Sequence, residues 1–524
     1  MKQIKLTFLL TVLISMVGAR ATAHDFAVVN ADGVTIYYEK TSATEVAVSY
    51  RGTGPNSYNN EYTGAVVIPS SVIYSGTTYS VTSIGNSAFY NCTGLTSVTI
   101  PNSVKSINSA AFSGCSGLTA ITMTYSVTSI ESYAFRNCSS LTSISLPGSV
   151  TSIGPSAFES CSNLISIDIP NSVRSIDYRA FYGTAWYDNQ PDGLVYAGKV
   201  AYAYKGTMPE NTSIDIEEGT KSITALAFAG CNGLKSITIP LGIASIEQGT
   251  FMGCRSLTSI SIPNSVTSID NQAFLWCESL TNITIPNNVM TMGNSVFSNC
   301  TSLTSIYVPF DKLAEWANGP LSDNKAQLAV KLTANAAGPA NYSTYYYGAT
   351  TSLKPNLVAD ENTTVYKAKQ KDASTLTLTT IDDRIIPDAT AVVLKTTDDE
   401  IVLRYTETAA TGDFTDNILE GSNTYKEVDP DTYYVLGQNA GNIGFYVFTG
   451  HVLAAGKAYI PVSSVSGMAA RGLTLEEDGE TTGIDNFAPT LPQGEEAVYD
   501  LQGRRVEHPV KGIYIVNGRK VVIR

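Results

Sequence analysis

The sequence predicts a mainly β protein whose central part is a solenoid of 23-residue repeats, and three observations lead to this prediction. The first is a phenylalanine that recurs every 23 residues within two runs, at Phe89, Phe112, Phe135, Phe158 and Phe181 and at Phe228, Phe251, Phe274 and Phe297. The second is that all 8 cysteines keep the same spacing, at Cys92, Cys115, Cys138, Cys161, Cys231, Cys254, Cys277 and Cys300. The third is composition: the 524 residues are 43% hydrophobic and only 15% charged, as in folded, strand-rich domains.

The first 23 residues have the layout of a secretory signal peptide. Lys2 and Lys5 give a basic start, and residues 6–17 form a mostly apolar run that is too short to span a bilayer. Ala21-Thr22-Ala23 follows as a small-x-small cleavage site. We therefore expect residues 1–23 to be removed and the mature chain to be exported. No later segment is apolar over a membrane-spanning length.

Residues 24–80 lack the repeat spacing but contain runs typical of strands, at 34–39, 45–51 and 65–68, separated by Gly and Asn. A stack of repeats leaves its core open at each end, so a terminal segment has to cover it. We predict that residues 24–80 form an N-terminal β cap.

The repeats occupy residues 81–310, and the copy that begins at Cys254 shows how one unit is built. Ile260 and Ile262 alternate with polar residues, which predicts a half-buried strand. Pro263 ends that strand because proline cannot donate to a ladder. Val266 and Ile269 form a second short apolar segment, and Ala273-Phe274 fills the interior at the next corner. One unit cannot bury its apolar side alone, so stacked units must share a continuous core.

The residues between the inward-facing positions of each strand are predicted to face solvent, because side chains alternate along a strand. One such column contains Thr99, Thr122, Ser145, Asp168, Thr238, Ser261, Thr284 and Tyr307. Its neighbour contains Ser97, Ala120, Ser143, Ser166, Ser236, Ser259, Asn282 and Ser305. Asp168, Tyr307 and the nearby Lys235 depart from this Ser/Thr pattern. Each of the three is either a ligand contact or incidental variation on a solvated face, and we treat them as candidate contacts.

The spacing is interrupted once, at residues 185–218, where Thr184 occupies the expected cysteine position. The next cysteine, Cys231, is 47 residues further on, which is two repeats plus one residue, so we expect the stack to continue. Alternating apolar residues at 194–204 predict a strand-turn-strand segment with Gly198 at the bend. Trp186 and Tyr187 precede it. These two aromatic residues are either a contact point for a ligand or packing on the flank of the solenoid, and packing is the more common role.

The cysteines are predicted to be buried free thiols. Each lies at the same point of its repeat, so all should line one interior column. Stacked neighbours that point the same way have poor geometry for disulfides. No histidine lies within the repeats, and zinc sites gather their ligands, so we predict no metal site and no cofactor.

The repeat spacing ends after Pro309. We expect residues 311–334 to be an end cap or linker with a short helix, followed by a loop up to about residue 330. Short strand candidates at regular spacing over 335–477 predict a β-sandwich-like domain. Residues 478–497 are acidic and contain Gly and Pro, as in a linker. Asn517-Gly518 between alternating apolar runs predicts a hairpin in a small C-terminal β module at 498–524.

The pattern L-T-S-I-x-I-P-x-S-V-x-S-I-x-x-x-A-F-x-x-C over about 81–309 resembles the BspA-type leucine-rich repeats of bacterial surface proteins. The tail segments V-Y-D-L-Q-G-R-R-V and K-G-I-Y-I-V-N-G-R-K-V are similar to C-terminal modules of exported Bacteroidetes proteins, some of which are sorting signals. The resemblance implies a leucine-rich-repeat solenoid in a secreted or cell-surface, outer-membrane-associated protein. It also implies attachment to host matrix proteins, such as fibronectin and fibrinogen, or to other bacteria, without a catalytic motif.

The net charge and the absence of catalytic motifs reduce the number of possible functions and partners. A formal net charge of −13 argues against nucleic acid and anionic membranes as partners. The 3 histidines lie far apart in the sequence, and no nucleophile elbow, zinc motif or phosphate loop is present, so we predict no enzymatic activity. We expect a non-catalytic protein that adheres to host or bacterial surface proteins through the repeats. The alternative is glycan binding by the 335–477 domain, with Tyr345, Tyr346 and Tyr347 as candidate aromatic platforms, of which at most two lie on one face because side chains alternate along a strand.

Overall fold

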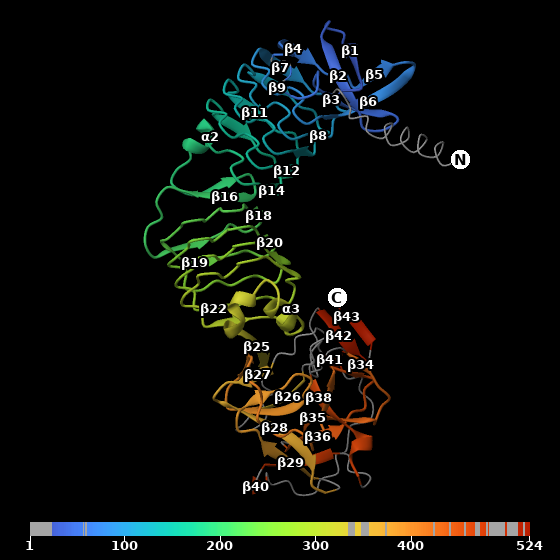
Figure 1. Ribbon diagram of the computed structural model, residues 1–524, viewed down its shortest axis with the longest axis vertical. Helices are drawn as coiled ribbons and strands as arrows, with labels where there is room; N and C mark the ends of the chain where they lie inside the picture. Colours follow the sequence, from blue (N-terminus) through green and yellow to red (C-terminus); the bar gives the residue numbers. More distant parts are fainter. Residues whose placement is uncertain are drawn as a thin grey trace, which may run out of the picture. The chain divides into compact units, whose positions relative to one another are not determined.

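The computed structural model describes two compact units, both built almost entirely of β strands (Figure 1). The described residues are 24–333 except 56 and 58–59, and then 341–346, 356–372, 375–422, 425–439, 442–454, 457–466, 472–477, 480–481, 498–499, 512–516 and 519–523. The predicted signal peptide at 1–23 and nearly all of the predicted linker at 478–497 lie outside them. The first unit contains residues up to Ser279 together with Asn288–Thr301, and the second contains Leu280–Asn287 and residues from Ser302 onward. Among the described helices, none is long and apolar enough to cross a bilayer.

The N-terminal strands extend both strand rows of the solenoid: residues 64–67 pair parallel with residues 95–99, and residues 83–84 pair parallel with residues 106–107. They are β1 (Phe26–Val29), β2 (Thr35–Lys40), β3 (Glu45–Ser49), β4 (Gly64–Val67), β5 (Ser71–Tyr74) and β6 (Thr77–Ile84). Strands β1, β2 and β3 pair antiparallel in sequence order, and β3 then pairs parallel with β6. The Tyr62 ring lies 4.5 Å from the ring of Phe89, the first phenylalanine of the repeats. The aromatic core is therefore covered at this end.

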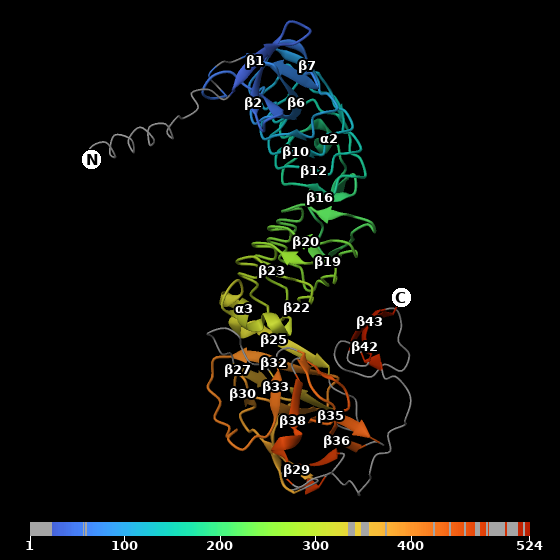
Figure 2. The same cartoon turned by 90° about the vertical axis from the view of Figure 1, so that its right-hand side faces the viewer.

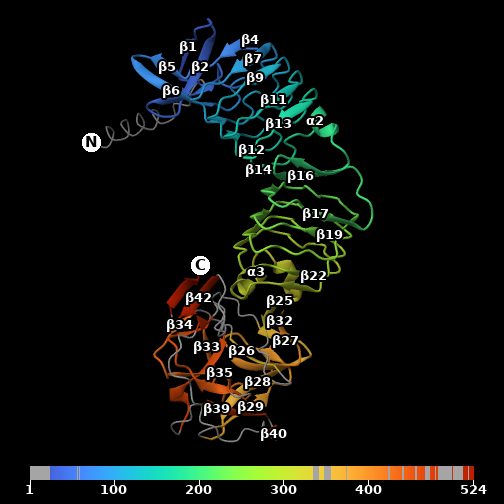
Figure 3. The ribbon, with the colours of Figure 1, turned by 180° about the vertical axis from the view of Figure 1, so that it is seen from behind.

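Most repeats contribute a strand to each of two rows, which we call the face strands and the short strands (Figures 2 and 3). The repeat that begins at Cys254 meets the face row only through an isolated bridge between Thr238 and Ser261. The face strands of the first unit are β7 (Leu95–Thr99), β9 (Ala120–Thr122), β11 (Ser143–Ser145), β13 (Ser166–Asp168), β17 (Thr212–Asp215) and β19 (Leu234–Thr238). The short strands are β8 (Ser106–Ile107), β10 (Ser129–Ile130), β12 (Ser152–Ile153), β14 (Ser175–Ile176), β18 (Ser222–Ile223), β20 (Ser245–Ile246), β21 (Ser268–Ile269) and β23 (Thr291–Met292). Parallel pairs join residues 23 apart, as Ile130 with Ile153, so the sequence period sets the register. This arrangement confirms the predicted mainly β fold with a repeat solenoid.

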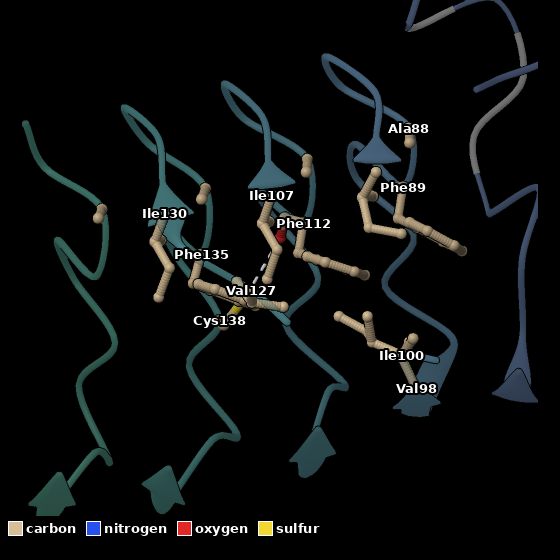
Figure 4. Packing of buried hydrophobic residues seen from close by; sticks show 14 of the residues in the cluster. Ala88, Phe89, Val98, Ile100, Ile107, Phe112, Val127, Ile130, Phe135 and Cys138 are labelled. Atoms are coloured by element: carbon tan, nitrogen blue, oxygen red, sulfur yellow. Dashed lines mark hydrogen bonds between the residues drawn. The ribbon is translucent and has the colours of Figure 1, made fainter. Parts of the chain in front are cut away.

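A column of stacked phenylalanine rings runs through the core of the repeats (Figure 4). Ring centroids are 4.8 Å apart between Phe89 and Phe112 and 5.2 Å apart between Phe112 and Phe135, with nearly parallel planes. Ile107, Ile130 and their counterparts pack beside the rings and are almost completely buried. Because each turn packs on its sequence neighbours, the repeats are stable only as a stack.

Two backbone positions in each turn adopt a left-handed conformation. The first lies two residues before each phenylalanine, at Ser87, Ala110, Tyr133, Ser156, Arg179, Leu226, Gly249, Gln272 and Ser295. The second lies directly before each cysteine position, at Asn91, Gly114, Asn137, Ser160, Gly183, Gly230, Gly253, Trp276 and Asn299. Asn and Gly tolerate this conformation best, which explains their frequency at the second position. These residues turn the chain sharply at the corner that carries the phenylalanine.

The interruption at 185–218 is accommodated inside the stack. Thr184 caps the short helix α2 (Ala185–Asp188), and β15 (Gly193–Ala197) pairs antiparallel with β16 (Val200–Lys205). Gly198 lies at the bend with φ +61°, which confirms the predicted strand-turn-strand segment. Val200 pairs parallel with Ser222 and Ala201 with Ile223, so β16 adds a rung to the short-strand row. The stack therefore continues through the interruption, as predicted.

The second unit contains a six-stranded sheet that begins with two repeat strands. Its order is β22 (Asn282–Thr284), β24 (Ser305–Tyr307), β25 (Leu328–Thr333), β32 (Glu400–Thr406), β27 (Asn356–Ala359) and β30 (Ile385–Ile386). Three short helices lie between β24 and β25, namely η1 (Phe310–Lys312), α3 (Leu313–Ala317) and η2 (Ser322–Gln327). The predicted helix within 311–334 is therefore confirmed. The loop predicted after it is wrong at residues 328–330, which belong to β25, a strand that pairs with both β24 and β32.

A ten-stranded sheet carries the other core of this unit. Its path is β26 (Asn341–Tyr345), β31 (Val392–Thr396), β28 (Thr363–Gln370), β29 (Thr375–Thr380), β39 (Gly472–Glu477), β36 (Asn442–Val447), β35 (Tyr433–Asn439), β38 (Lys457–Pro461) and β33 (Glu420–Ser422), and β40 (Glu480–Thr481) pairs with β39. The sheet curls so that β26 also meets β38, where the Lys457 ammonium donates to the Ser343 hydroxyl at 3.2 Å. The buried cluster around Phe445 comes from this sheet and its adjoining segments. A sandwich of two facing sheets over 335–477 thus stays a prediction.

The remaining elements are small. Strands β34 (Lys426–Glu427) and β37 (Val452–Leu453) form a two-stranded pair, and η3 (Val462–Ser464) is one short turn. In the tail, β42 (Gly512–Val516) pairs antiparallel with β41 (Val498–Tyr499) and with β43 (Arg519–Ile523). Val516 opposes Arg519, which confirms the hairpin predicted around Asn517-Gly518.

Candidate functional site

The outward-facing column of the face strands is exposed through most of the repeat region. Thr99, Thr122, Ser145, Asp168, Thr238, Ser261 and Thr284 are all exposed. Several hydroxyl groups of this face hold neighbouring turns together: the Ser236 hydroxyl donates to that of Ser213 at 2.8 Å, and the Thr119 hydroxyl donates to the Thr96 carbonyl oxygen at 3.0 Å. The face is therefore a polar, nearly uncharged surface with part of its hydrogen-bonding capacity already used.

Asp168 and Lys235 are exposed on this face but are not brought together. Asp168 ends β13, and its carboxylate accepts a hydrogen bond from the Ser145 hydroxyl at 3.2 Å. Lys235 lies in β19, which belongs to a different sheet. Its carbonyl oxygen accepts from the Thr258 hydroxyl at 3.4 Å, and its ammonium forms no ion pair within the described part of the chain. The described neighbours of Asp168 and Lys235 do not form a cluster of side chains typical of a binding site.

The outward-facing columns of the face strands are no longer open to solvent at their last predicted members, Ser305 and Tyr307. Ser305 is only 3% exposed, and the Arg404 guanidinium donates to its hydroxyl at 2.8 Å. Tyr307 is half-buried, with the Lys331 ammonium 4.3 Å from its ring centroid. The prediction that both side chains lie on an open face is wrong, because β25 pairs alongside β24 and brings Lys331 and the β32 residue Arg404 over it.

Trp186 and Tyr187 pack on the flank of the repeats. Both are half-buried and lie against the core of the first unit. The Trp186 ring meets the Phe181 ring edge-on at 4.9 Å, and the Tyr187 ring meets the Tyr202 ring in the same way at 5.7 Å. Burial, followed by the neighbouring Asp188 carboxylate, raises the pKa of Tyr187. These contacts favour the packing alternative over a ligand contact.

A cluster that the sequence analysis missed lies at the left-handed corner of three consecutive turns. We call it the corner patch, and it consists of Tyr133, Arg136, Tyr178, Arg179 and Tyr182. The three tyrosines are 42%, 41% and 51% exposed. The Arg179 guanidinium lies 5.2 Å from the Tyr178 ring centroid and 4.7 Å from that of Tyr182. The signal in the sequence was the appearance of Tyr133 and Arg179 at a position that most other turns fill with Ser, Ala or Gly.

The middle turn of the corner patch is covered by its neighbours. Ser156 and Glu159 are 6% and 9% exposed. The Glu159 carboxylate pairs with the Arg136 guanidinium at 3.2 Å, and that guanidinium also lies 5.6 Å from the Tyr133 ring centroid. Main-chain hydrogen bonds from Tyr133 to the Pro155 carbonyl (2.9 Å) and from Ser156 to the Tyr178 carbonyl (3.0 Å) join the three turns. The backbone that carries the side chains of the corner patch is thus held in place by hydrogen bonds between the turns.

All eight cysteines are free and buried, which confirms the prediction for them. Burial raises the pKa of the Cys92 thiol to about 11 and that of Cys231 to about 12. Thiolates are the reactive form of cysteine, so these thiols are poor nucleophiles in the folded protein. They fill the interior and do not provide a catalytic group.

Comparison with known proteins agrees with this repeat geometry. The family model described as the BspA type leucine rich repeat region matches residues 75–188 and 200–322, in 6 copies. The repeat region belongs to the BspA-type leucine-rich repeat family. No curated protein matches the chain.

Three solved structures are similar to part of this chain. A leucine rich cell surface protein from Faecalibacterium prausnitzii has 24% identity and a TM-score of 0.26, over 58% of this chain and 98% of that one. The pneumococcal vaccine antigen PcpA has 20% identity and a TM-score of 0.30, over 54% and 82%. A leucine-rich repeat protein from Bacteroides ovatus has 23% identity and a TM-score of 0.24, over 56% and 96%.

Outside the BspA-type region, only part of the proposed aromatic platform of the second unit is described, and there Tyr346 is half-buried. Tyr345 is only 1% exposed, so the prediction that it stacks on a sugar is wrong. It points into the protein because β26 lies in the curled ten-stranded sheet. Tyr347 lies outside the described residues. Within the described ranges, no three His, Cys, Asp or Glu side chains gather as metal ligands would.

Proposed function

We propose that this protein is a non-catalytic binding protein that is exported to the cell surface or secreted. It attaches to host or bacterial surface proteins through its BspA-type repeats. The observation that carries the proposal is the long solvent-exposed surface of the stacked turns, which includes both a polar strand face and a patch of exposed tyrosine and arginine. Solenoids commonly use such extended surfaces for binding.

The interior of the repeats supports binding over catalysis. The side chains with the most reactive chemistry in the repeats, the cysteines, are all buried. The exposed strand face carries mainly Ser and Thr, which suit recognition by hydrogen bonds more than bond cleavage. A net charge of −13 disfavours polyanionic partners and leaves extracellular proteins as the favoured class.

Binding of the purified full chain to immobilised fibronectin, fibrinogen and intact host cells tests this proposal. We expect saturable binding to at least one of them, and the same chain after heat denaturation serves as the matched control. Absence of saturable binding to every target would count against adhesion. Recovery of the protein only from the cytoplasm of the producing bacterium would count against export.

Glycan binding by the second unit is the alternative, and the structure does not favour it. Its main support was an exposed tyrosine pair, and the burial of Tyr345 removes one member. A glycan array probed with the full chain would restore this alternative if it showed specific binding that survives substitution of the corner patch.

A further inference from the structure

We propose that the corner patch is the docking site for a carboxylate-bearing segment of a partner protein, with Arg179 as the residue that binds the carboxylate. This inference rests on the proposed protein-binding function and names the place and the chemistry of the contact. It moves the expected contact from the strand face to the corner of the turns at 131–137, 154–160 and 177–183.

Backbone conformation is the first observation behind this proposal. Tyr133 and Arg179 have φ values of 60° and 58°, in the left-handed region. Large L-residues are disfavoured there, and residues held in this region tend to gather at functional sites. Equivalent positions in the other turns hold Ser87, Ala110, Ser156, Gly249 and Ser295, together with the larger Leu226 and Gln272. Tyr133 and Arg179 are the two residues of this set that carry an aromatic ring or a charge, which is the chemistry that a binding surface uses.

The electrostatics of Arg179 are the second observation. Its guanidinium is held between two tyrosine rings and forms no ion pair within the described residues. Arg136, by contrast, is already paired with Glu159. Burial, and then the Glu131 carboxylate, raise the pKa of the adjacent Asp177, so Arg179 does not neutralise that carboxyl group. A stacked arginine whose charge is not compensated can accept a carboxylate in bidentate geometry.

The composition of the corner patch favours a protein partner. Tyrosine and arginine are enriched at the centres of protein interfaces, and tyrosine supplies a large contact area with little loss of side-chain entropy. Contacts between the tyrosine rings and the guanidinium groups hold these side chains before binding, which lowers the entropy that binding must remove. Neighbouring parallel turns are about 4.8 Å apart, so three turns match a short peptide segment rather than a membrane surface.

Residues at the same positions in other turns show which substitutions the local backbone can accept, and we choose the test variants from them. Gln272 occupies the same position as Arg179 in another turn, with φ 59°, so Arg179→Gln suits the local backbone. Ser113 and Ser298 occupy the position of Tyr182, which makes Tyr182→Ser equally compatible. Arg255→Gln is the matched control, because Arg255 is an exposed arginine of the same region that is paired with Glu278 at 3.0 Å.

The experiment selects ligands for the full chain from a random 12-residue peptide phage library and measures the selected peptides by fluorescence anisotropy. We expect the selected peptides to share at least one Asp or Glu position, with affinity that falls as salt rises. Arg179→Gln and Tyr182→Ser should each weaken binding by about tenfold or more, while Arg255→Gln should leave it unchanged.

Several outcomes would overturn the inference. These are selected peptides without acidic residues, equal losses for Arg179→Gln and Arg255→Gln, or binding of hyaluronan fragments in place of peptides at the corner patch. If the full chain binds a matrix protein and Arg179→Gln binds it equally well, the inference fails and the proposed function stands. If neither the library nor the matrix proteins and cells give a specific interaction, the proposed function fails with it.

Discussion

The Cys138 thiol donates a hydrogen bond to the main-chain carbonyl oxygen of Phe112, in the preceding turn, at 3.1 Å. The same bond recurs for five other cysteines, namely Cys115, Cys161, Cys254, Cys277 and Cys300. The cysteine column therefore links consecutive turns while it fills the core. This double role accounts for cysteine at these six positions, where the free thiols link neighbouring turns.

Replacement of Cys138 by alanine should lower the free energy of unfolding by about 1–2 kcal/mol, because it opens a small cavity and removes a weak hydrogen bond. The Phe112 carbonyl keeps its bond from the Cys115 amide at 3.1 Å, so the loss should not be larger. Urea denaturation of the full chain measures the change. Ser139→Ala, next in the sequence, is the control, and an equal loss in both variants would contradict this account.

Alkaline pH should destabilise the protein through the same thiols. Burial raises the pKa of Cys92 to about 11 and that of Cys231 to about 12, whereas an unfolded cysteine titrates near about 8.5. The unfolded state therefore releases protons first, and the stabilisation that is complete below the unfolded pKa is lost as pH rises toward the folded values. We expect the urea midpoint to fall steadily between about pH 9 and pH 11.

Thiol labelling offers a check on the protonation argument that does not depend on stability. At pH 8 the native chain should react with a disulfide reagent far more slowly than the same chain in concentrated urea, where all 8 thiols should react. Fast labelling of several thiols in the native chain would show that the cysteine column is open to solvent.

Replacement by glycine should change the stability of the fold in opposite directions at two adjacent alanines, Ala110 and Ala111. Ala110 has φ +55°, so Ala110→Gly should stabilise the fold by about 0.5–1 kcal/mol by relieving the left-handed strain. Ala111 is fully buried beside Phe112, so Ala111→Gly should destabilise by about 1 kcal/mol or more. Thermal unfolding of the two variants decides the matter. Shifts of the same sign in both variants would show that the left-handed corner does not control stability.

Much of the repeat fold could be predicted from the sequence because the residues that determine it recur at a fixed spacing. The 23-residue spacing places every phenylalanine and cysteine inside, and it also sets the strand register. The curled sheet of the second unit was harder to predict because its contacts are distant in sequence. Strand β28 places Lys367 in a buried position, where it is 7% exposed and its ammonium meets the Asp416 carboxylate at 2.6 Å. A lysine in such a run argues against a buried strand until its partner is known.

The candidate site was only partly predictable for a related reason. Asp168 and Lys235 were found because they break the polar pattern of the exposed strand face. The corner patch lies where the chain bends, and alternation along a strand says nothing about direction there. Tyr133 and Arg179 could have been noticed by comparing their position with Ser, Ala and Gly in other turns. That they have left-handed φ values, and that Arg179 stacks on two rings, required the structure.

The most direct test of the central claim compares three forms of the full chain in binding to immobilised fibronectin and fibrinogen and to host cells. The forms are the unchanged protein, the corner variant Arg179→Gln with Tyr182→Ser, and the strand-face variant Asp168→Ser with Lys235→Thr. We predict saturable binding by the unchanged protein, a loss of about tenfold or more in the corner variant, and little change in the strand-face variant. Absence of saturable binding by the unchanged protein to every target would contradict the claim that the repeats form a protein-binding surface.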